Sequence, residues 1–441
     1  MSRILIVSLG TSPEPIINAI SSLRPDRVLF VCSEISRDQL TIVRSQVPLA
    51  DFDEERDVIV LQQRLSPKQG EEVINELDQL DCVYLRASQM IQQVRREQPG
   101  CELTVDYTGG TKTMTTGLAM AAIDAGGVKL NITTSDRQKN QSTLSGYSAP
   151  VPVNTSAIQA RRLEQFELPA LLKRFDYEAA RQAVRRVLEL PNAQPNSTRK
   201  LRRLEELLVA LDAWDRFDHK TAVEVLLSLK DRRLDSLLLF PLKRVIASRS
   251  WLDPLVNEQK WPKMNCHGLE AVEDLLLNAE RRAAQRRYDD AVGRLYRATE
   301  LTAQLLLRNG VTNQVGPSGL MTDAINIELL PTDLKETYRA KEGLDGKVKL
   351  GLTASYELLA QLNHPIGSIW QEQKYRIIDQ LKIRNNSLFA HGFQPISYQA
   401  WQSLKTTLGG FLQLALTLHG NSASSAQQLP NNLEFLLSSE E

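Results

Sequence analysis

Two residues near the C-terminal end of the chain have side chains that could do chemistry on a phosphate. Arg384 and His391 lie in the stretch YRIIDQLKIRNNSLFAHGFQP (375–395), whose pattern predicts a helix that ends at Gly392. At about 100° per residue, a spacing of seven brings both side chains to nearly the same helix face, about 10 Å apart along the axis. The two could converge on one phosphate, and the neighbouring Asn385 could orient either of them.

This pair suits the cleavage of RNA. RNA carries its own nucleophile, the 2′-hydroxyl, so a metal-free ribonuclease needs proton transfer and a cation at the phosphate. Arginine supplies the cation, and a helix C-terminus favours a protonated histidine, which can protonate the leaving oxygen. Because one pair is a small active site, catalysis would require two chains to bring their pairs together. The alternative is that Arg384 and His391 are ordinary surface residues of a helix.

The stretch DYTGGTKTM (106–114) indicates a second site, which would bind an anion. It differs from a P-loop, which needs a glycine immediately before its lysine and another six positions before that lysine. Thr111 and Asp106 occupy those positions here. A strand pattern before the glycines and a helix pattern after them still place free N–H groups and the positive end of a helix dipole beside Lys112. The alternative is that the glycine pair only makes a tight turn.

The segments around this loop predict an α/β domain. Over residues 1 to about 150, short apolar runs alternate with helical patterns, as in a parallel sheet covered by helices on both faces. SLGTSP (8–13) and DYTGGTKTM both follow strand patterns, and ligands of such sheets bind outside the carboxyl ends of the strands. We therefore expect a doubly wound fold with both turns at one site. The predicted strands are ILIVSL (4–9), RVLFVCSE (27–34), VIVL (58–61), LTVDY (103–107) and VKLNIT (128–133).

After residue 150 the pattern becomes helical. SAPVPVNTS (148–156) has the prolines and small polar residues of a linker, and strand patterns end there. For the rest of the chain we predict an all-α connecting domain over 151–260, a C-terminal α-helical bundle over 261–420 and a loose tail over 421–441.

The composition limits the partners of the protein. The 441 residues include 53 acidic and 53 basic ones, so any contact with nucleic acid must be local. The basic run ERRAAQRR (280–287) is interleaved with other residue types, which predicts a solvated helix face, and His219 is predicted at the surface of a helix start. Four cysteines without CxxC spacing, no signal peptide and no membrane-spanning run predict a cytoplasmic protein without membrane association. No metal-site motif is visible.

Together, the two sites resemble those of a known family. SLGTS and DYTGGTKTM look like the ligand loops of CARF domains, the Rossmann-like sensors of CRISPR-associated accessory proteins. RNNSLFAH (384–391), with six residues between its arginine and histidine, looks like the catalytic motif of HEPN ribonucleases. RRYDDAVGRLYRATEL (286–301) also resembles an early HEPN helix. The resemblance covers both ends of the chain, whereas residues 157–260 carry no motif that we can assign.

The resemblance implies a function in type III CRISPR antiviral defence. In such proteins cyclic oligoadenylate binds between two CARF domains, and the HEPN domains of the same dimer then cut single-stranded RNA. For this chain the resemblance implies a homodimer, no cofactor or metal, and cyclic oligoadenylate as activator, with cyclic tetraadenylate expected ahead of cyclic hexaadenylate. By motif, the catalytic residues would be Arg384, Asn385 and His391, and the ligand-binding residues would be Gly10, Thr11, Ser12, Gly109, Gly110, Thr111, Lys112 and Thr113.

Two other functions stay open at this point. In one, the chain is a nucleotide-sensing regulatory protein whose helical half binds a partner and whose HEPN-like domain is structural and non-catalytic. In the other, which adds to ribonuclease activity, Thr11, Ser12 and Thr111 orient a ribose 2′-hydroxyl against its phosphate, so that the CARF loops also cleave the activator.

Overall fold

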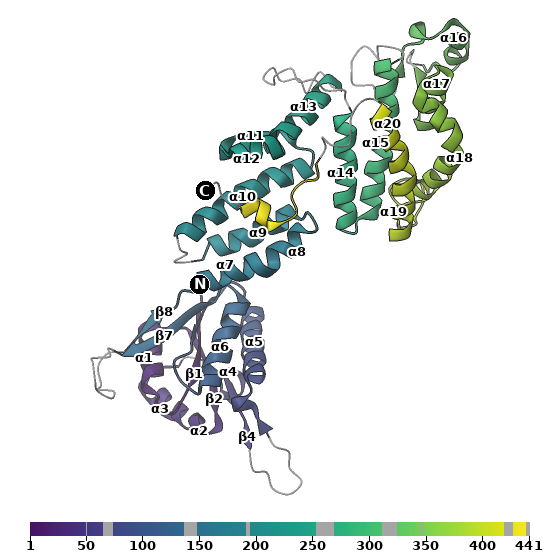
Figure 1. Ribbon diagram of the computed structural model, residues 1–441. Helices are drawn as coiled ribbons and strands as arrows, with labels where there is room; N and C mark the ends of the chain where they lie inside the picture. The colour runs from purple at the N-terminus through teal and green to yellow at the C-terminus, as the bar shows by residue number, and fades with distance from the viewer. Residues whose placement is uncertain are drawn as a thin grey trace. The chain divides into compact units, whose positions relative to one another are not determined.

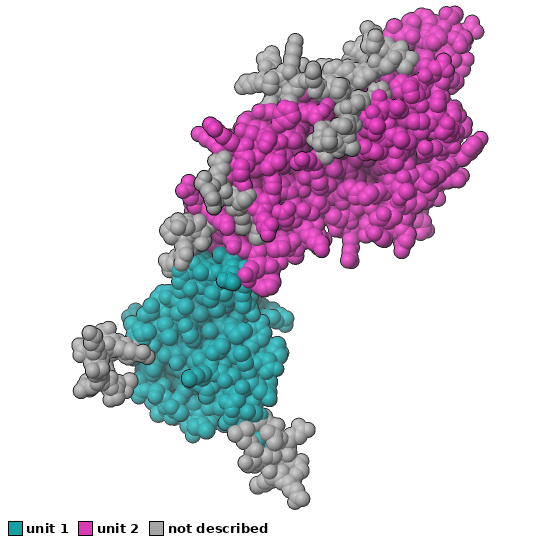
Figure 2. Space-filling model, in the orientation of Figure 1, with its two compact units in different colours: residues 1–162, 189–197 teal, residues 163–188, 198–441 magenta. Residues whose placement is uncertain are grey.

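The chain forms two compact units in the computed structural model (Figures 1 and 2). One unit contains Met1–Arg162 and Glu189–Ser197, and the other contains Leu163–Leu188 and Thr198–Glu441. The fold class predicted from the sequence, an α/β part followed by helical parts, is confirmed. The structure describes residues 1–49, 51–64, 74–135, 148–190, 195–252, 269–310, 324–344, 346, 348–418 and 427–437.

The first unit is built on a six-stranded sheet (Figure 1). The strand order is β3-β2-β1-β6-β7-β8. The first five strands in this order run parallel, and β8 pairs antiparallel with β7 at the edge. All five strands predicted from the sequence are present. The strands are β1 (Arg3–Leu9), β2 (Arg27–Ser33), β3 (Val58–Leu61), β6 (Glu102–Asp106), β7 (Lys129–Ser135) and β8 (Ser148–Pro152).

The alternation of side chains along β1 gives the sheet two apolar faces. Ile4 and Ile6 belong to one buried cluster, which includes residues of α5 and α6, whereas Leu5 and Val7 belong to another with residues of α1 and α3. Helices on both faces make this a doubly wound fold, as predicted. The helices of this unit are α1 (Glu14–Leu23), α2 (Glu34–Arg37), α3 (Gln39–Gln46), α4 (Glu54–Asp57), η1 (Glu76–Asp78), α5 (Leu80–Glu97), α6 (Lys112–Ala125) and α7 (Ser156–Arg162), and a small hairpin is formed by β4 (Gln63–Arg64) and β5 (Ile74–Asn75).

The predicted linker at 148–156 was wrong in its first part, because residues 148–152 form β8. Val151 of β8 lies opposite Ile132 of β7 in the ladder. Pro150 and Pro152 are compatible with this strand because it lies at the edge of the sheet, where a strand has no second neighbour that needs its N–H groups. The α/β unit therefore extends beyond residue 150.

The second unit is helical within its described residues, apart from the short strand pair β9 (Ala324–Ile325) and β10 (Val348–Lys349). The predicted domain boundary at residue 260 lies outside the described residues. The helices are η2 (Leu163–Glu167), α8 (Leu168–Leu172), α9 (Tyr177–Leu188), α10 (Pro195–Asp215), α11 (His219–Leu229), α12 (Arg232–Leu234), η3 (Asp235–Leu239), α13 (Phe240–Leu252), α14 (Glu270–Ala284), α15 (Tyr288–Gly310), η5 (Ile327–Leu329), α16 (Thr332–Arg339), α17 (Leu352–Gln361), α18 (Pro365–Asn385), α19 (Tyr398–Leu404), η6 (Lys405–Gly409), α20 (Gly410–Leu418) and α21 (Leu433–Leu437).

Aromatic side chains fix the packing of the C-terminal helices. Tyr356 of α17 stacks on Trp370 of α18 with 4.7 Å between ring centroids, and Phe411 of α20 meets Tyr356 edge-on at 5.1 Å. The Tyr356 hydroxyl donates to the carbonyl oxygen of Thr299 in α15, at 2.8 Å. This core ties α15 to α18, the two helices that carry the residues discussed below.

A buried polar network joins the connecting helices to α14. Asp274 of α14 accepts a hydrogen bond from Nε1 of Trp214 (3.0 Å) and lies 3.1 Å from Nε2 of His219, while Asp215 accepts from Nε of Arg281 (2.7 Å). The surface position predicted for His219 was wrong, since only 3% of it is exposed. The solvated face predicted for 280–287 was also wrong at Arg281, which is 1% exposed. Both buried groups have partners more than 50 residues away in sequence, which no local pattern reveals.

The prediction of a loose C-terminal tail was wrong for residues 427–437. The side chain of Gln428 accepts a hydrogen bond from Nη1 of Arg281 at 2.7 Å, and the Tyr177 hydroxyl donates to the carbonyl oxygen of Pro430 at 2.9 Å. Leu429 is buried. These contacts attach the segment to the second unit, and residues 421–426 lie outside the described residues.

Candidate functional site

In the first unit, the two glycine-bearing turns lie against each other. They follow β1 and β6, which are neighbouring parallel strands. A β-carbon at Gly10 would lie 2.6 Å from the backbone nitrogen of Gly110, and a β-carbon at Gly109 would lie 2.4 Å from the backbone oxygen of Ser8. Only glycine allows two backbones to approach so closely. The sheet thus brings the two sequence motifs to one edge.

The rim of this edge carries hydroxyls, N–H groups and one cation. Thr111 is the N-cap of α6, and its Oγ1 accepts a hydrogen bond from the N–H of Met114 at 3.3 Å. Lys112 is the first residue of the helix, where a positive charge opposes the helix dipole unless an anion lies nearby. Within the described residues Lys112 has no acidic partner. Of the predicted ligand-binding residues, Thr11, Ser12, Gly110, Thr111 and Lys112 are exposed, and Gly10, Gly109 and Thr113 are partly buried.

Asp106 organises the loop from below, a role that the sequence analysis missed. The side chain is fully buried, and Oδ1 accepts hydrogen bonds from the backbone N–H (3.0 Å) and Oγ1 (2.5 Å) of Thr108. Oδ2 accepts from Oγ1 of Thr133 in β7 at 2.7 Å. Asp106 therefore uses both carboxylate oxygens inside the protein. The signal in the sequence was an aspartate two residues before a threonine at a strand end, a common turn pattern.

In the second unit, the predicted helix does not reach His391. Helix α18 ends at Asn385, and residues 386–392 form turns. The helical spacing proposed for Arg384 and His391 was therefore wrong. Leu388 and Phe389 lie within the predicted helix, but they are 62% and 65% exposed. These two side chains therefore do not pack into the core of the second unit.

A compact turn nevertheless returns His391 to the end of the helix. The backbone N–H of His391 donates to the carbonyl oxygen of Asn385 at 3.1 Å, and that of Gln394 donates to the carbonyl of Asn386 at 3.1 Å. Gly392 lies so close to Asn386 that a β-carbon would be 2.1 Å from the Asn386 oxygen. The backbone of His391 is thus held beside Asn385 by the turn, and the side chains of both residues are exposed.

Arg384 lies against an aromatic ring from another helix. Its guanidinium carbon is 4.2 Å from the ring centroid of Tyr296 in α15, and Nη1 donates to Oδ1 of the neighbouring Asn385 at 3.3 Å. Both Arg384 and Tyr296 are partly buried. The same helix holds the chain after the turn, because Asp289 accepts a hydrogen bond from the N–H of Ile396 at 3.1 Å. The sequence analysis gave no role to Tyr296.

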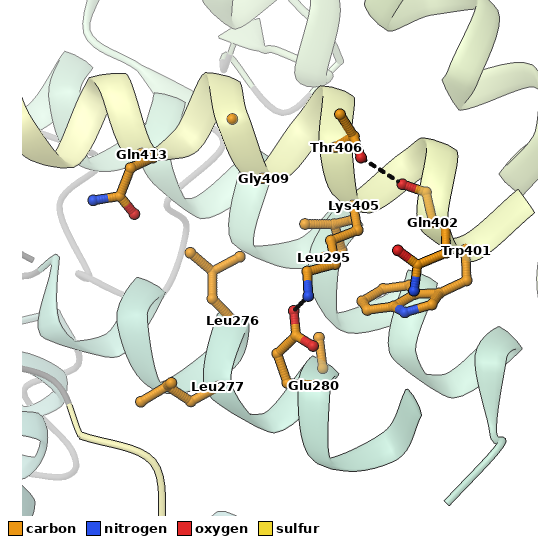
Figure 3. Close-up of a pocket in the computed structure, with 12 residues that line it drawn as sticks. Leu276, Leu277, Glu280, Leu295, Trp401, Gln402, Lys405, Thr406, Gly409 and Gln413 are labelled. Atoms are coloured by element: carbon orange, nitrogen blue, oxygen red, sulfur yellow. Dashed lines mark hydrogen bonds and ion pairs between the residues drawn. The ribbon is translucent and has the colours of Figure 1, made fainter. Parts of the chain in front are cut away.

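A separate pocket of about 440 Å³ lies between α14, α15 and the α19–α20 segment (Figure 3). Leu276, Leu295 and Trp401 contribute apolar surface, and an ion pair of 2.8 Å joins Lys405 to Glu280. No residue that the sequence predicted for catalysis or ligand binding lines this pocket.

Comparison with known proteins gives a family match and a similar solved structure. Residues 264–415 match the family model of the Csm6 HEPN domain. The solved structure of Enterococcus italicus Csm6 bound to cyclic hexa-2′-fluoro-hexa-dAMP has a similar fold, with a TM-score of 0.54. The similarity covers 96% of this chain and 96% of that chain, at 14% sequence identity. The chain is similar to Csm6.

This similarity confirms the predicted resemblance to CARF–HEPN proteins. The range matched by the Csm6 HEPN family model includes α14, α15, α18 and the turn with His391. A comparison with curated proteins gives no match. Among the described residues there is no group of three or more histidine, cysteine, aspartate or glutamate side chains that could hold a metal ion, and no helix is long and apolar enough to cross a membrane.

Proposed function

We propose that this protein is a cyclic-oligoadenylate-activated endoribonuclease of type III CRISPR antiviral defence. It cuts single-stranded RNA without a metal ion and acts in the cytoplasm. The observation that carries the proposal is the match of residues 264–415 to the Csm6 HEPN domain, because that range contains Arg384, Asn385 and His391. Support for the activator comes from the fold similarity to a Csm6 bound to a cyclic oligonucleotide.

The chemistry of cleavage follows from the side chains of the motif. The 2′-hydroxyl of RNA gives its proton to solvent and attacks the adjacent phosphate, so the bond to the 5′-oxygen of the next nucleotide breaks and a 2′,3′-cyclic phosphate remains. Arg384 stabilises the negative charge that develops on the phosphate, and His391 transfers the proton that the leaving oxygen needs. Asn385, which accepts a hydrogen bond from Arg384, orients the guanidinium.

A homodimer completes the proposal. One chain supplies a single arginine and a single histidine, whereas a two-fold axis beside the motif would supply two of each. The side chains next to His391 fit such an interface: Leu388, Phe389 and Phe393 are 62%, 65% and 85% exposed. Exposed apolar side chains of this size, grouped along one short segment, are typical of protein–protein contacts.

The activator is proposed to bind at the edge of the first unit where the two turns meet. Backbone N–H groups of the glycine turns, the hydroxyls of Thr11, Ser12 and Thr113, and the ammonium of Lys112 suit phosphates and ribose hydroxyls. An anion at this place would also satisfy the charge of Lys112 at the start of α6. A cyclic ligand on the two-fold axis of the dimer meets each of these groups twice.

A pair of single substitutions tests sensing and cleavage separately. His391→Ala should abolish RNA cleavage, measured in EDTA with cyclic oligoadenylate present, while leaving ligand binding intact. Lys112→Ala should weaken ligand binding about tenfold, through loss of one charge-assisted contact, and cleavage should recover at high ligand concentration. Full cleavage by His391→Ala protein would refute the catalytic assignment. Wild-type protein that binds the ligand but leaves every RNA intact would favour the regulatory alternative.

Degradation of the activator is tested with the same proteins. The His391→Ala protein is incubated with radiolabelled cyclic oligoadenylate, and the products are separated. Cleavage of the ligand by this protein would place a second activity in the first unit. Intact ligand would assign any degradation seen with wild-type protein to the HEPN site.

A further inference from the structure

The environment of Arg384 differs from that of most partly buried arginines. Its guanidinium lies over the ring of Tyr296, whose centroid is 4.2 Å from the guanidinium carbon. Within the part of the chain that the structure describes, its one hydrogen bond to a side chain goes to the neutral amide of Asn385. Among the described residues no carboxylate forms an ion pair with Arg384.

This contact leaves the arginine free to bind a phosphate. A carboxylate partner would occupy the N–H groups along the edge of the guanidinium and neutralise its charge. An aromatic ring instead contacts the flat face of the guanidinium and leaves the N–H donors along its edge available. The ring also limits the many rotamers that a long arginine side chain would otherwise sample.

We propose that Tyr296 is a positioning residue that holds the guanidinium of Arg384 against its ring, ready to receive the scissile phosphate of the RNA. This inference rests on the ribonuclease function proposed above and adds a residue that the Arg–His motif does not contain. Tyr296 acts through Arg384 and does not touch the substrate.

The rest of α15 supports this role. Asp289 lies seven residues before Tyr296, so both side chains point to nearly the same face of the helix. Asp289 binds the N–H of Ile396 beyond the turn, and the ring of Tyr288 lies 5.8 Å from that of Tyr398. One helix thus contacts the chain on both sides of the segment that contains His391.

The hydroxyl of Tyr296 is not needed for this role. Burial, followed by the nearby Glu300 carboxylate, raises the pKa of Tyr296 above its ordinary value. The phenol therefore stays protonated at working pH and is no general base. Replacement by phenylalanine keeps the ring and should keep the function, whereas leucine removes the ring.

Steady-state RNA cleavage with saturating activator tests the proposal. Tyr296→Leu should lower kcat about tenfold, within the roughly 2- to 30-fold range that a cation–π contact is worth, and change KM less than about threefold. Tyr296→Phe should keep at least about half of the wild-type kcat. The matched control is Tyr375→Leu on α18, which removes a 76% exposed ring near Lys374 and should leave cleavage unchanged.

A second series guards against misfolding of the leucine variant. Phenylalanine analogues with one, two and three ring fluorines at position 296 keep the shape but weaken the negative face of the ring, so kcat should fall stepwise. An unchanged kcat across this series, or Tyr296→Phe as inactive as Tyr296→Leu, would overturn the inference. If wild-type protein cuts RNA and Arg384→Ala does not, the function stands whatever the Tyr296 series gives. If wild-type protein never cuts RNA, both proposals fail.

Discussion

At the scale of single residues, close backbone contacts shape both candidate sites. Gly10 and Gly109 let the two turns of the first unit touch, and Gly392 lets the turn after α18 fold back on Asn386. The glycines of the ligand turns could be recognised in the sequence, because a glycine pair between a strand and a helix is a local pattern. Gly392 was assigned to the end of a helix, whereas the helix ends at Asn385 and Gly392 lies in the turn that follows.

The turn that holds His391 gives a prediction at this scale. Gly392→Ala places a methyl group 2.1 Å from the carbonyl oxygen of Asn386, a backbone atom that must then move. The displaced turn should lower RNA cleavage by about tenfold or more, since overpacking of this kind destabilises a site by roughly 1–3 kcal/mol. Tryptophan fluorescence should still show cooperative unfolding of the second unit, with the free energy of unfolding lowered by no more than about 3 kcal/mol.

The control for this substitution is Gly293→Ala in α15. A β-carbon there has no neighbour within 4 Å, and alanine favours a helix over glycine by roughly 0.5–1 kcal/mol. Cleavage should therefore be unaffected. Equal activity of Gly392→Ala and wild-type protein would show that the turn does not position His391.

At the scale of elements, the strands were predictable and their order was not. Strands β1 and β2 are nearly continuous apolar runs, which is a local signal, whereas the order β3-β2-β1-β6-β7-β8 depends on pairing between distant segments. Strand β8 was missed because Pro150 and Pro152 indicate a linker in most contexts. Helix α18 was predicted in its body, but its end at Asn385 was not.

A buried ion cluster holds one edge of this sheet. Asp57, the last residue of α4, is fully buried and accepts hydrogen bonds from Arg27 (2.6 and 2.9 Å), from Arg56 and from the N–H of Asp53. Burial alone would raise the pKa of Asp57, but the hydrogen bonds from Arg56, Asp53 and Arg27 outweigh it and lower the pKa. The charged carboxylate therefore stabilises the folded unit.

Asp57→Asn should lower the free energy of unfolding of the first unit by about 3 kcal/mol, because it leaves Arg27 buried with a weaker partner set. All five tryptophans lie beyond residue 210, so hydrogen exchange of β2 amides is the suitable measurement. Asp51→Asn is the control, since Asp51 pairs with Arg56 at 3.4 Å but its side chain is 85% exposed. That change should have an effect below about 0.5 kcal/mol.

The effect of Asp57 should also depend on pH in a defined direction. A carboxylate whose pKa is lowered by folding contributes stability above its unfolded pKa of about 3.9, and this contribution is lost as the pH falls through the folded pKa. The difference between wild-type and Asp57→Asn protein should be complete at pH 6–7 and shrink below about pH 4. A difference that stayed constant down to pH 3 would contradict the role given to the charge.

At the scale of the whole molecule, the sequence predicted the two ends of the chain better than the middle. The ends carry motifs, whereas the connecting helices are joined to α14 by buried polar contacts between residues far apart in sequence. Arg281 and His219 looked like surface residues for this reason. Inside the second unit, Asp215 accepts a hydrogen bond from Arg281, and Asp274 lies within hydrogen-bond distance of His219. The balance of 53 acidic and 53 basic residues fits an RNA site that is local and gated by a ligand.

The central claim is that a cyclic oligoadenylate bound at the glycine turns switches on RNA cleavage at Arg384 and His391. The most direct test is the rate of single-stranded RNA cleavage by wild-type protein in EDTA. Cyclic tetraadenylate, cyclic hexaadenylate and linear oligoadenylate are compared with no ligand. One cyclic ring should raise the rate about 10- to 100-fold over both the linear ligand and no ligand, a range typical of allosteric coupling. Cleavage that is equally fast without ligand, or absent with every cyclic ligand, would contradict the account.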